Sequence, residues 1–242
     1  MTDFPMARLL LLSNSTNHGK GYLDHCMEEI LDILDGRQRL AFVPFALLDR
    51  ETYGAKAQER FGQVGIETRS LSLGNTAETL DWAEAFFVGG GNTFRLLKTL
   101  QEGDLLTEVR QRVSQGAVYM GASAGANIAA PTIRTTNDMP IVEPGSFDAI
   151  ALVPFQINPH YVDPPPNTTH MGETRDQRLA EYLEENAAPV VGIPEGAWIR
   201  VDDRQALVGG TRPIRIFRRH ETPEERHPGE DLSDLLEPSV ST

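Results

Sequence analysis

Short runs of apolar residues alternate with longer segments of helical spacing along the first 130 residues of the chain. The runs predict buried strands, and the segments between them place apolar side chains three and four positions apart, which is typical of helices. The predicted strands are 8–12, 40–45, 66–71, 85–88 and 117–120, and the predicted helices are 22–34, 51–64, 76–82, 94–100 and 104–114. This alternation predicts an α/β fold in three layers, with a mostly parallel sheet covered by helices on both faces. Sites in such folds form beyond the carboxyl ends of the strands.

The pattern changes after residue 130. Residues 131–166 are rich in proline, asparagine and threonine, and a long irregular stretch of this kind is usually a functional loop. A further helix is predicted at 174–185, a strand at 190–193, and a terminal meander at 198–201, 206–208 and 214–217. We therefore expect a single α/β domain over residues 1–220. Residues 221–242 hold seven acidic groups and one arginine, and we expect a solvated, disordered tail there.

The most informative motif is a serine flanked by glycines. Ser123 lies between Gly121 and Gly125, where the strand 117–120 gives way to a run of small residues. The spacing Gly-x-Ser-x-Gly at a strand-to-helix turn is typical of a nucleophile elbow, in which the backbone amide of Ala124 points toward a developing oxyanion. The alternative is a glycine-rich turn whose serine only caps the helix. The motif by itself leaves both interpretations open.

A nucleophilic serine needs a base and a carboxylate that orients the base. His160 is the strongest candidate base, because it follows the strand-like run 156–159. The other histidines lie in a predicted helix, in loops or in the charged end of the chain: His25, His18, His170, His220 and His227. The carboxylate is open between four loop residues: Asp138, Asp148, Asp163 and Glu195.

Composition narrows the classes of function. A formal net charge of -13 disfavours binding to nucleic acid or to an anionic membrane surface. The single cysteine, Cys26, excludes an intrachain disulfide and a thiolate metal cluster, and the histidines are scattered, so we expect no metal and no cofactor. No apolar run approaches the length of a membrane span, and the first residues lack a signal-peptide pattern. We therefore expect a cytoplasmic protein.

Six sequence runs together resemble the peptidase E family of α-aspartyl dipeptidases. They are residues 11–15, 88–94, 121–127, 131–142, 156–160 and 172–175, and the resemblance extends over residues 8–217. The run 131–142 is too specific to arise by chance. The resemblance implies the flavodoxin-like, parallel-sheet fold of class I glutamine amidotransferases, with serine at the position of their cysteine.

The resemblance also implies roles for particular residues. The implied catalytic triad is Ser123, Asp138 and His160, acting through an acyl-enzyme on dipeptides whose first residue is aspartate. The implied oxyanion donors are the backbone amides of Ala124 and of Gly90 or Gly91. Arg134 and Arg175 are the implied partners of the substrate carboxylate, because a guanidinium can bind a carboxylate through two hydrogen bonds. Either arginine could instead pair with a nearby acid. Asn92 and Glu195 are the remaining candidates, for the substrate's amino group.

Two other functions fit part of the pattern. An esterase of the α/β-hydrolase kind shares the elbow, but its histidine normally follows many more strands, whereas His160 lies only 37 residues (160 − 123) after Ser123. A non-catalytic protein could use the same pocket to bind acidic peptides. Turnover of an Asp-Leu dipeptide separates both from a dipeptidase that acts on small peptides. The sequence leaves open whether the protein is a monomer or a homodimer.

Overall fold

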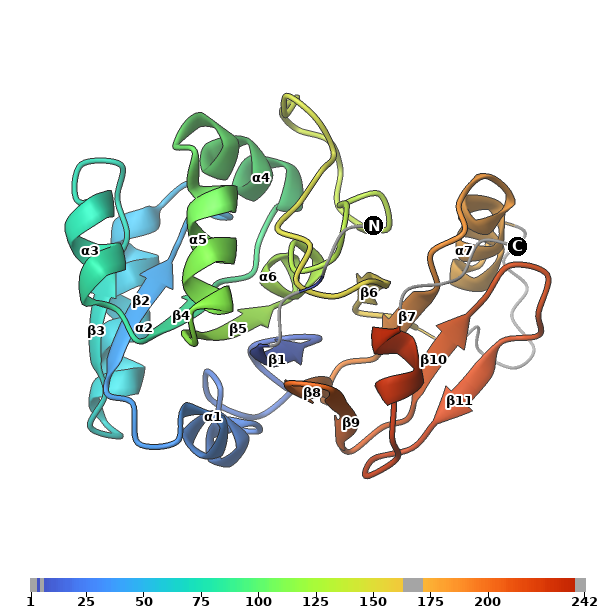
Figure 1. Cartoon of the computed structure of the whole chain (residues 1–242), viewed down its shortest axis with the longest axis horizontal. Coiled ribbons are helices and arrows are strands. Elements are labelled where there is room, and N and C mark those ends of the chain that lie inside the picture. The colour runs from blue at the N-terminus through green and yellow to red at the C-terminus, as the bar shows by residue number, and fades with distance from the viewer. Residues whose placement is uncertain (1–3, 5–6, 163–171, 238–242) are drawn as a thin grey trace.

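The computed structural model describes residue 4, residues 7–162 and residues 172–237, and its strands form a seven-stranded and a four-stranded sheet (Figure 1). The larger sheet has the order β3-β2-β4-β5-β1-β8-β9. Its strands are β1 (Arg8–Leu12), β2 (Arg39–Val43), β3 (Glu67–Ser70), β4 (Ala85–Val88), β5 (Val118–Ala122), β8 (Ala197–Asp202) and β9 (Gln205–Gly210). The first five strands in this order are parallel, whereas β8 and β9 pair antiparallel. The predicted α/β fold with a mostly parallel sheet is confirmed.

Side chains of the central strands alternate between two helical layers, because successive residues of a strand point to opposite faces of the sheet. In β1, Leu9 and Leu11 pack into one apolar core, and Leu10 and Leu12 pack into the other. The first core is covered by α3 (Thr76–Trp82), α4 (Thr93–Glu102) and α5 (Leu105–Ser114), and the second by α1 (Met27–Leu34) and α2 (Arg50–Gly62) (Figure 1). Strands buried on both faces form continuous apolar runs, which explains why the sequence reveals them.

The smaller sheet has the order β11-β10-β7-β6 and lies beside β8 and β9 (Figure 1). Its strands are β6 (Gln156–Pro159), β7 (Val190–Ile193), β10 (Ile214–Phe217) and β11 (Glu224–Arg226). The helix α7 (Arg175–Glu185) packs on this sheet through Leu179 and Leu183. The predicted meander is therefore divided, since β8 and β9 join the larger sheet and β10 joins the smaller one. The prolines at 164–166 and His170 lie outside the described residues.

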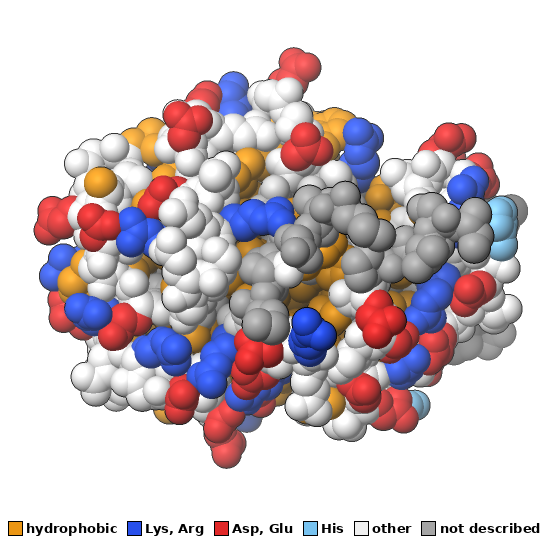
Figure 2. Space-filling view, viewed as in Figure 1, with side chains coloured by type: hydrophobic (Ala, Val, Ile, Leu, Met, Phe, Trp, Pro, Cys, Tyr) orange, Lys and Arg blue, Asp and Glu red, His pale blue; other side chains and the backbone are white. Residues whose placement is uncertain are grey.

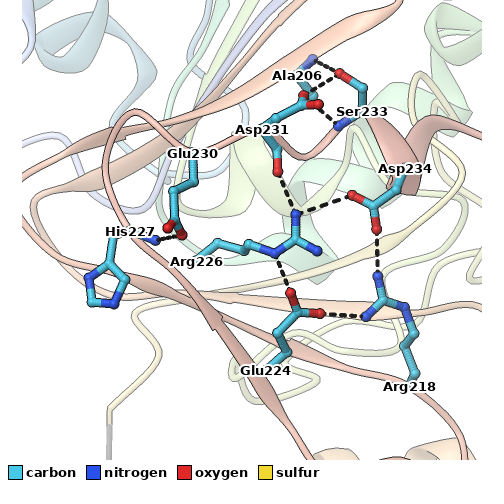
Figure 3. A network of polar contacts seen from close by, with 9 residues as sticks. All are labelled: Ala206, Arg218, Glu224, Arg226, His227, Glu230, Asp231, Ser233 and Asp234. Carbon is cyan, nitrogen blue, oxygen red and sulfur yellow. Dashed lines mark hydrogen bonds and ion pairs between the residues drawn. The ribbon is translucent and has the colours of Figure 1, made fainter.

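The acidic segment after residue 220 packs on the body of the protein as far as residue 237. The strand β11 pairs with β10, and a single 3₁₀ turn, η1, spans Ser233–Leu236. Glu224 and Asp234 both pair with Arg218 and Arg226 (Figure 3). Leu232 is fully buried in the larger core. The predicted disordered tail is therefore wrong for residues 221–237, because arginine partners and apolar anchors offset its acidic composition; residues 238–242 lie outside the described residues.

Leu232→Ala should lower the free energy of unfolding by about 2–5 kcal/mol, because it removes a buried side chain and leaves a cavity. Denaturation in urea, followed by circular dichroism, measures the change. Glu225→Gln is the matched control, since Glu225 is exposed on β11, and it should leave the free energy of unfolding nearly unchanged. An equally stable Leu232→Ala variant would restore the interpretation of residues 221–237 as a detached tail.

Candidate active site

Ser123 lies at a sharp turn between β5 and the short helix α6 (Ala124–Asn127). Its backbone φ is 55°, a left-handed value that is uncommon for a residue with a side chain and that marks local strain. A Cβ at Gly121 would overlap the carbonyl of Gly125, and one at Gly125 would overlap the carbonyl of Val88. The two glycines therefore allow the turn to form, and the predicted strand–turn–helix geometry is confirmed.

His160 contacts the nucleophile directly. It follows the last residue of β6, and its Nε2 lies 2.9 Å from Ser123 Oγ. The other ring nitrogen, Nδ1, lies 2.9 Å from Glu195 Oε1. A carboxylate can only accept, so this contact places the proton of neutral His160 on Nδ1 and leaves Nε2 to accept from the serine hydroxyl. The side chains of His160 and Glu195 are 40% and 59% exposed.

The register of the smaller sheet explains why Glu195 reaches His160. Pro159 of β6 pairs in parallel with Ile193 of β7. His160 follows the first of these residues directly, and Glu195 comes two positions after the second, so both side chains extend from the same edge of one sheet. Glu195 also comes two residues after the strand that the sequence predicts at 190–193. The pairing of that strand with β6 is what the pattern could not reveal.

Asp138 lies elsewhere, and the expected contact with His160 does not occur among the described residues. The carboxylate Oδ2 of Asp138 accepts hydrogen bonds from Thr93 N at 2.7 Å and Thr93 Oγ1 at 2.6 Å. Thr93 is the first residue of α4, and the first amides of a helix lack intrahelical partners and attract a negative charge. The predicted position of Asp138 beside the base is therefore wrong, and Glu195 occupies that position.

The glycine-rich loop after β4 lies against the elbow. A Cβ at Gly90 would lie 3.0 Å from Ser123 Cβ, so the loop backbone closely approaches the nucleophile. Gly91 has a φ of 137°, and a Cβ there would lie 2.7 Å from Ala46 O. Burial raises the pKa of Tyr53, whose hydroxyl would lie 2.5 Å from a Cβ at Gly89. Glycines at 89 and 90 thus let the loop backbone pass close to Tyr53 and Ser123.

Asn92 caps α4 and is held at both ends of its side chain. Its Oδ1 accepts from Arg95 N at 3.0 Å, and its Nδ2 donates to Met139 O at 2.9 Å. These contacts leave little capacity for the substrate's amino group, the role implied by the resemblance. Glu195, the other residue implied for that role, contacts His160 instead.

The two candidate arginines lie in different places. Arg134 stacks on Phe147, with its Cζ 4.9 Å from the ring centroid, and lines a cavity of about 280 Å³ together with Asp138. Ser123 and His160 do not line this cavity. Arg175 donates to Asn137 Oδ1.

Asn137 connects Arg175 to the loop that carries the base. Its Nδ2 donates to Pro159 O at 2.7 Å, and Pro159 directly precedes His160. Burial lowers the pKa of Arg175, and the neighbouring Arg178 lowers it further. Among the described residues no carboxylate pairs with Arg175. Asn137 belongs to the polar run 135–138 inside the long loop, but nothing in that run marks it as a link to Arg175.

The remaining expectations concern metals, thiols and membranes. Within the described ranges, no three histidine, cysteine or acidic side chains cluster as metal ligands, and no helix is long and apolar enough to cross a bilayer. Cys26 is buried, and burial raises the pKa of its thiol to about 12. Its thiol therefore remains protonated at neutral pH, as expected of a small residue buried in the core.

The amino-acid sequence is similar to a known peptidase family over most of its length. The profile of peptidase family S51 matches residues 9–209. Peptidase E of Streptomyces coelicolor is 54% identical over 230 residues, which cover 95% of each chain. A probable alpha-aspartyl dipeptidase of Drosophila melanogaster is 43% identical over 233 residues, or 95% of this chain and 97% of the relative.

Two solved structures share the fold. A putative peptidase E protein from Listeria monocytogenes superposes with a TM-score of 0.64 at 22% identity, over 86% of this chain and 100% of the other. A peptidase from an acI-B1 Actinobacterium superposes with a TM-score of 0.69 at 17% identity, over 94% of this chain and 96% of the other. At these identities the likeness concerns the fold alone.

Proposed function

The chain belongs to peptidase family S51, and on that basis we propose that it is a serine-type dipeptidase that hydrolyses Asp-Xaa dipeptides. The observation that carries the proposal is the chain of contacts from Glu195 through His160 to Ser123, with 2.9 Å at each step. The names of the Streptomyces and Drosophila relatives support a peptidase and an aspartyl dipeptide as substrate. A cytoplasmic location is part of this proposal, and the single cysteine, which allows no intrachain disulfide, favours it.

The proposed reaction is acyl transfer to Ser123. The serine Oγ attacks the carbonyl carbon of the peptide bond while His160 Nε2 takes the hydroxyl proton. The peptide C–N bond then breaks, and His160 gives its proton to the leaving amine. A water molecule, deprotonated by His160, next attacks the acyl-enzyme. The bond between the acyl carbon and Ser123 Oγ breaks, His160 returns the proton to that oxygen, and the aspartate is released.

The negative oxygen that forms in each step needs backbone donors. Ala124 begins α6 directly after the nucleophile, and its amide is one proposed donor. The second proposed donor is the amide of Gly90 or of Gly91, in the loop whose backbone closely approaches Ser123. Glu195 is proposed to orient His160 and to stabilise the imidazolium form in the transition state.

Arg175 is the proposed partner of the substrate's β-carboxylate. On the face shown in Figure 2, acidic and basic side chains are interspersed, and the chain as a whole carries a charge of -13. An acidic substrate therefore gains little from the overall field and needs a local cation. Arg175 is half-buried, has no described carboxylate partner and is linked through Asn137 to the loop of the base. Arg134 is less suited, since Phe147 holds it over a separate cavity.

We expect efficient cleavage of Asp-Leu, little cleavage of Glu-Leu or Asn-Leu, and none of Asp-Leu with a blocked amine. A guanidinium that binds the substrate's carboxylate is left desolvated and without a partner when the substrate lacks that carboxylate. Arg175→Met should therefore lower kcat/KM for Asp-Leu by about 10- to 100-fold, a loss typical of a charge-assisted hydrogen bond, and should narrow the preference over Asn-Leu. Release of leucine from each dipeptide measures both.

Two arginine variants serve as controls. Arg178→Met removes an exposed cation from the same helix, where Arg178 pairs with Glu173 at 3.5 Å, and should keep the Asp-Leu rate. Arg134→Met should also keep it. Selective loss in Arg134→Met instead would move recognition to that residue, and wild-type rates in both Arg134→Met and Arg175→Met would refute this account of specificity. Turnover of a short-chain ester but of no dipeptide would favour an esterase, and tight Asp-Leu binding without turnover would favour a binding protein.

A further inference from the structure

The end of β1 contacts all three loops that carry the proposed triad. The carbonyl of Leu12 accepts a hydrogen bond from Ser123 N at 3.0 Å. The hydroxyl of Ser13 accepts one from His160 N at 2.9 Å. The side-chain Oδ1 of Asn14 accepts one from Gly196 N, directly after Glu195, at 2.9 Å. Three consecutive residues thus touch the nucleophile, base and acid loops in turn.

Ser13 joins the two loops that extend from the smaller sheet. Its hydroxyl accepts from His160 N and also donates to Ile193 O at 2.7 Å. The side chain is fully buried, so water does not compete for either bond. His160 itself has a φ of 52°, an unfavourable conformation for a residue with a side chain. The bond from Ser13 therefore holds the base in a backbone state that it would otherwise leave readily.

Asn14 fixes the turn that follows Glu195. It is 3% exposed, and besides bonding Gly196 N its Nδ2 donates to Thr16 O at 2.9 Å and to Asn17 Oδ1 at 2.7 Å. Gly196 has a φ of 82°, and a Cβ there would lie 3.2 Å from Asn17 Nδ2. The turn after Glu195 is thus held closely against the end of β1.

The side chains of the base and the acid need this support. His160 is 40% exposed and Glu195 is 59% exposed, so packing around the side chains constrains them only in part. Catalysis depends on the reacting groups being held in a narrow range of distances and angles. Alignment of the triad must therefore come largely from the backbone of the loops.

We propose that Ser13 and Asn14 are positioning residues, which set the base and acid loops relative to Ser123. The inference rests on the proposed triad of Ser123, His160 and Glu195. The competing explanation is that both residues only satisfy buried polar groups and so support folding. The two explanations differ in a measurable way. A positioning role changes the rate at each folded active site, whereas a purely structural role changes how many folded sites exist.

The experiment measures both quantities for Ser13→Ala. A serine-directed fluorophosphonate counts the reactive Ser123 sites by covalent titration, and hydrolysis of Asp-Leu gives kcat per titrated site and KM. Thr99→Val is the matched control, because Thr99 is also buried and its hydroxyl accepts one hydrogen bond, from Arg50 on α2 at 3.2 Å. Ser13→Thr keeps a hydroxyl and tests whether that group restores the rate.

Ser13→Ala should keep its titratable sites but lower kcat per site by about 10- to 100-fold, as expected for a small displacement of a catalytic group, with KM little changed. Slower labelling by the fluorophosphonate should accompany this loss. Thr99→Val should keep kcat per site, and Ser13→Thr should recover most of it. An unchanged kcat per site in Ser13→Ala, with fewer sites, would overturn the proposal.

If Ser13→Ala does not fold, the titrated sites and the kcat per site are measured for Asn14→Ala instead. The same outcomes then support or overturn the proposal. Failure of the triad itself is distinguishable. In that case Ser123→Ala keeps its turnover and the wild-type protein is not labelled at Ser123, whereas failure of the positioning role alone leaves both of those results as proposed.

Discussion

Ser123→Ala is expected to abolish hydrolysis of Asp-Leu, with a fall in kcat on the order of 10⁶-fold, as when the nucleophile of a serine protease triad is removed. The variant lacks the hydroxyl that His160 Nε2 contacts, so no nucleophile remains at that position. Folding should be unaffected, because alanine keeps the Cβ of serine and its smaller side chain fits the same turn. Steady-state release of leucine and a thermal melt measure the two effects.

Ser114→Ala is a suitable control for this result. Ser114 ends α5, and its hydroxyl donates to the carbonyl of Gln111 at an exposed position. This variant should keep full turnover. Near-normal activity in Ser123→Ala would mean that the elbow is not the catalytic centre, and the serine mechanism would have to be abandoned.

Glu195→Gln is expected to lower kcat by about 10²- to 10⁴-fold, where the upper figure is the loss seen when a triad histidine takes the wrong tautomer. The amide of glutamine can donate to Nδ1, which would place the ring proton on Nε2 and prevent that nitrogen from accepting the proton of Ser123. We expect the lower part of this range, because Glu195 is more than half exposed and water can partly replace it. Turnover of Asp-Leu measures the loss.

Asp138→Asn is the informative comparison. Asp138 bonds the first residue of α4, directly after the glycine-rich loop, so its replacement should loosen that loop and lower both turnover and stability, but with a smaller loss of turnover than in Glu195→Gln. A severe loss for Asp138→Asn together with nearly normal turnover for Glu195→Gln would return the orienting role to Asp138.

The two carboxylates show where sequence reasoning stopped. The elbow and the larger sheet could be predicted because their signals are local: glycines around one serine, and apolar runs that are buried on both faces. The partner of His160 depends instead on the parallel pairing of β6 with β7, which are separated by about thirty residues that include α7. Asp138 was nearer in sequence to both Ser123 and His160, but the start of α4 attracts its carboxylate.

Two further differences from the sequence prediction concern the acidic segment and the start of α1. Residues 221–237 appeared disordered by composition, yet their acids pair with arginines of and beside the smaller sheet, and Leu232 reaches the main core. The first predicted helix began at residue 22, whereas α1 begins at Met27. Leu23 has a φ of 61°, which is incompatible with a right-handed helix and which no apolar spacing reveals.

The division of the proposed triad between two sheets has a consequence for how this enzyme tolerates change. Ser123 is carried by the larger sheet, whereas His160 and Glu195 are carried by the smaller one, and the two sheets share an apolar core that includes Leu11, Ile193 and Leu232. Activity therefore depends on the relative position of the two sheets as much as on the chemistry of the three side chains. We call the core residues that lie between the two sheets the seam. Substitutions at the seam, far from Ser123, should change turnover even where they are too mild to unfold the protein. Selection for activity would then act on this seam as strictly as on the triad itself.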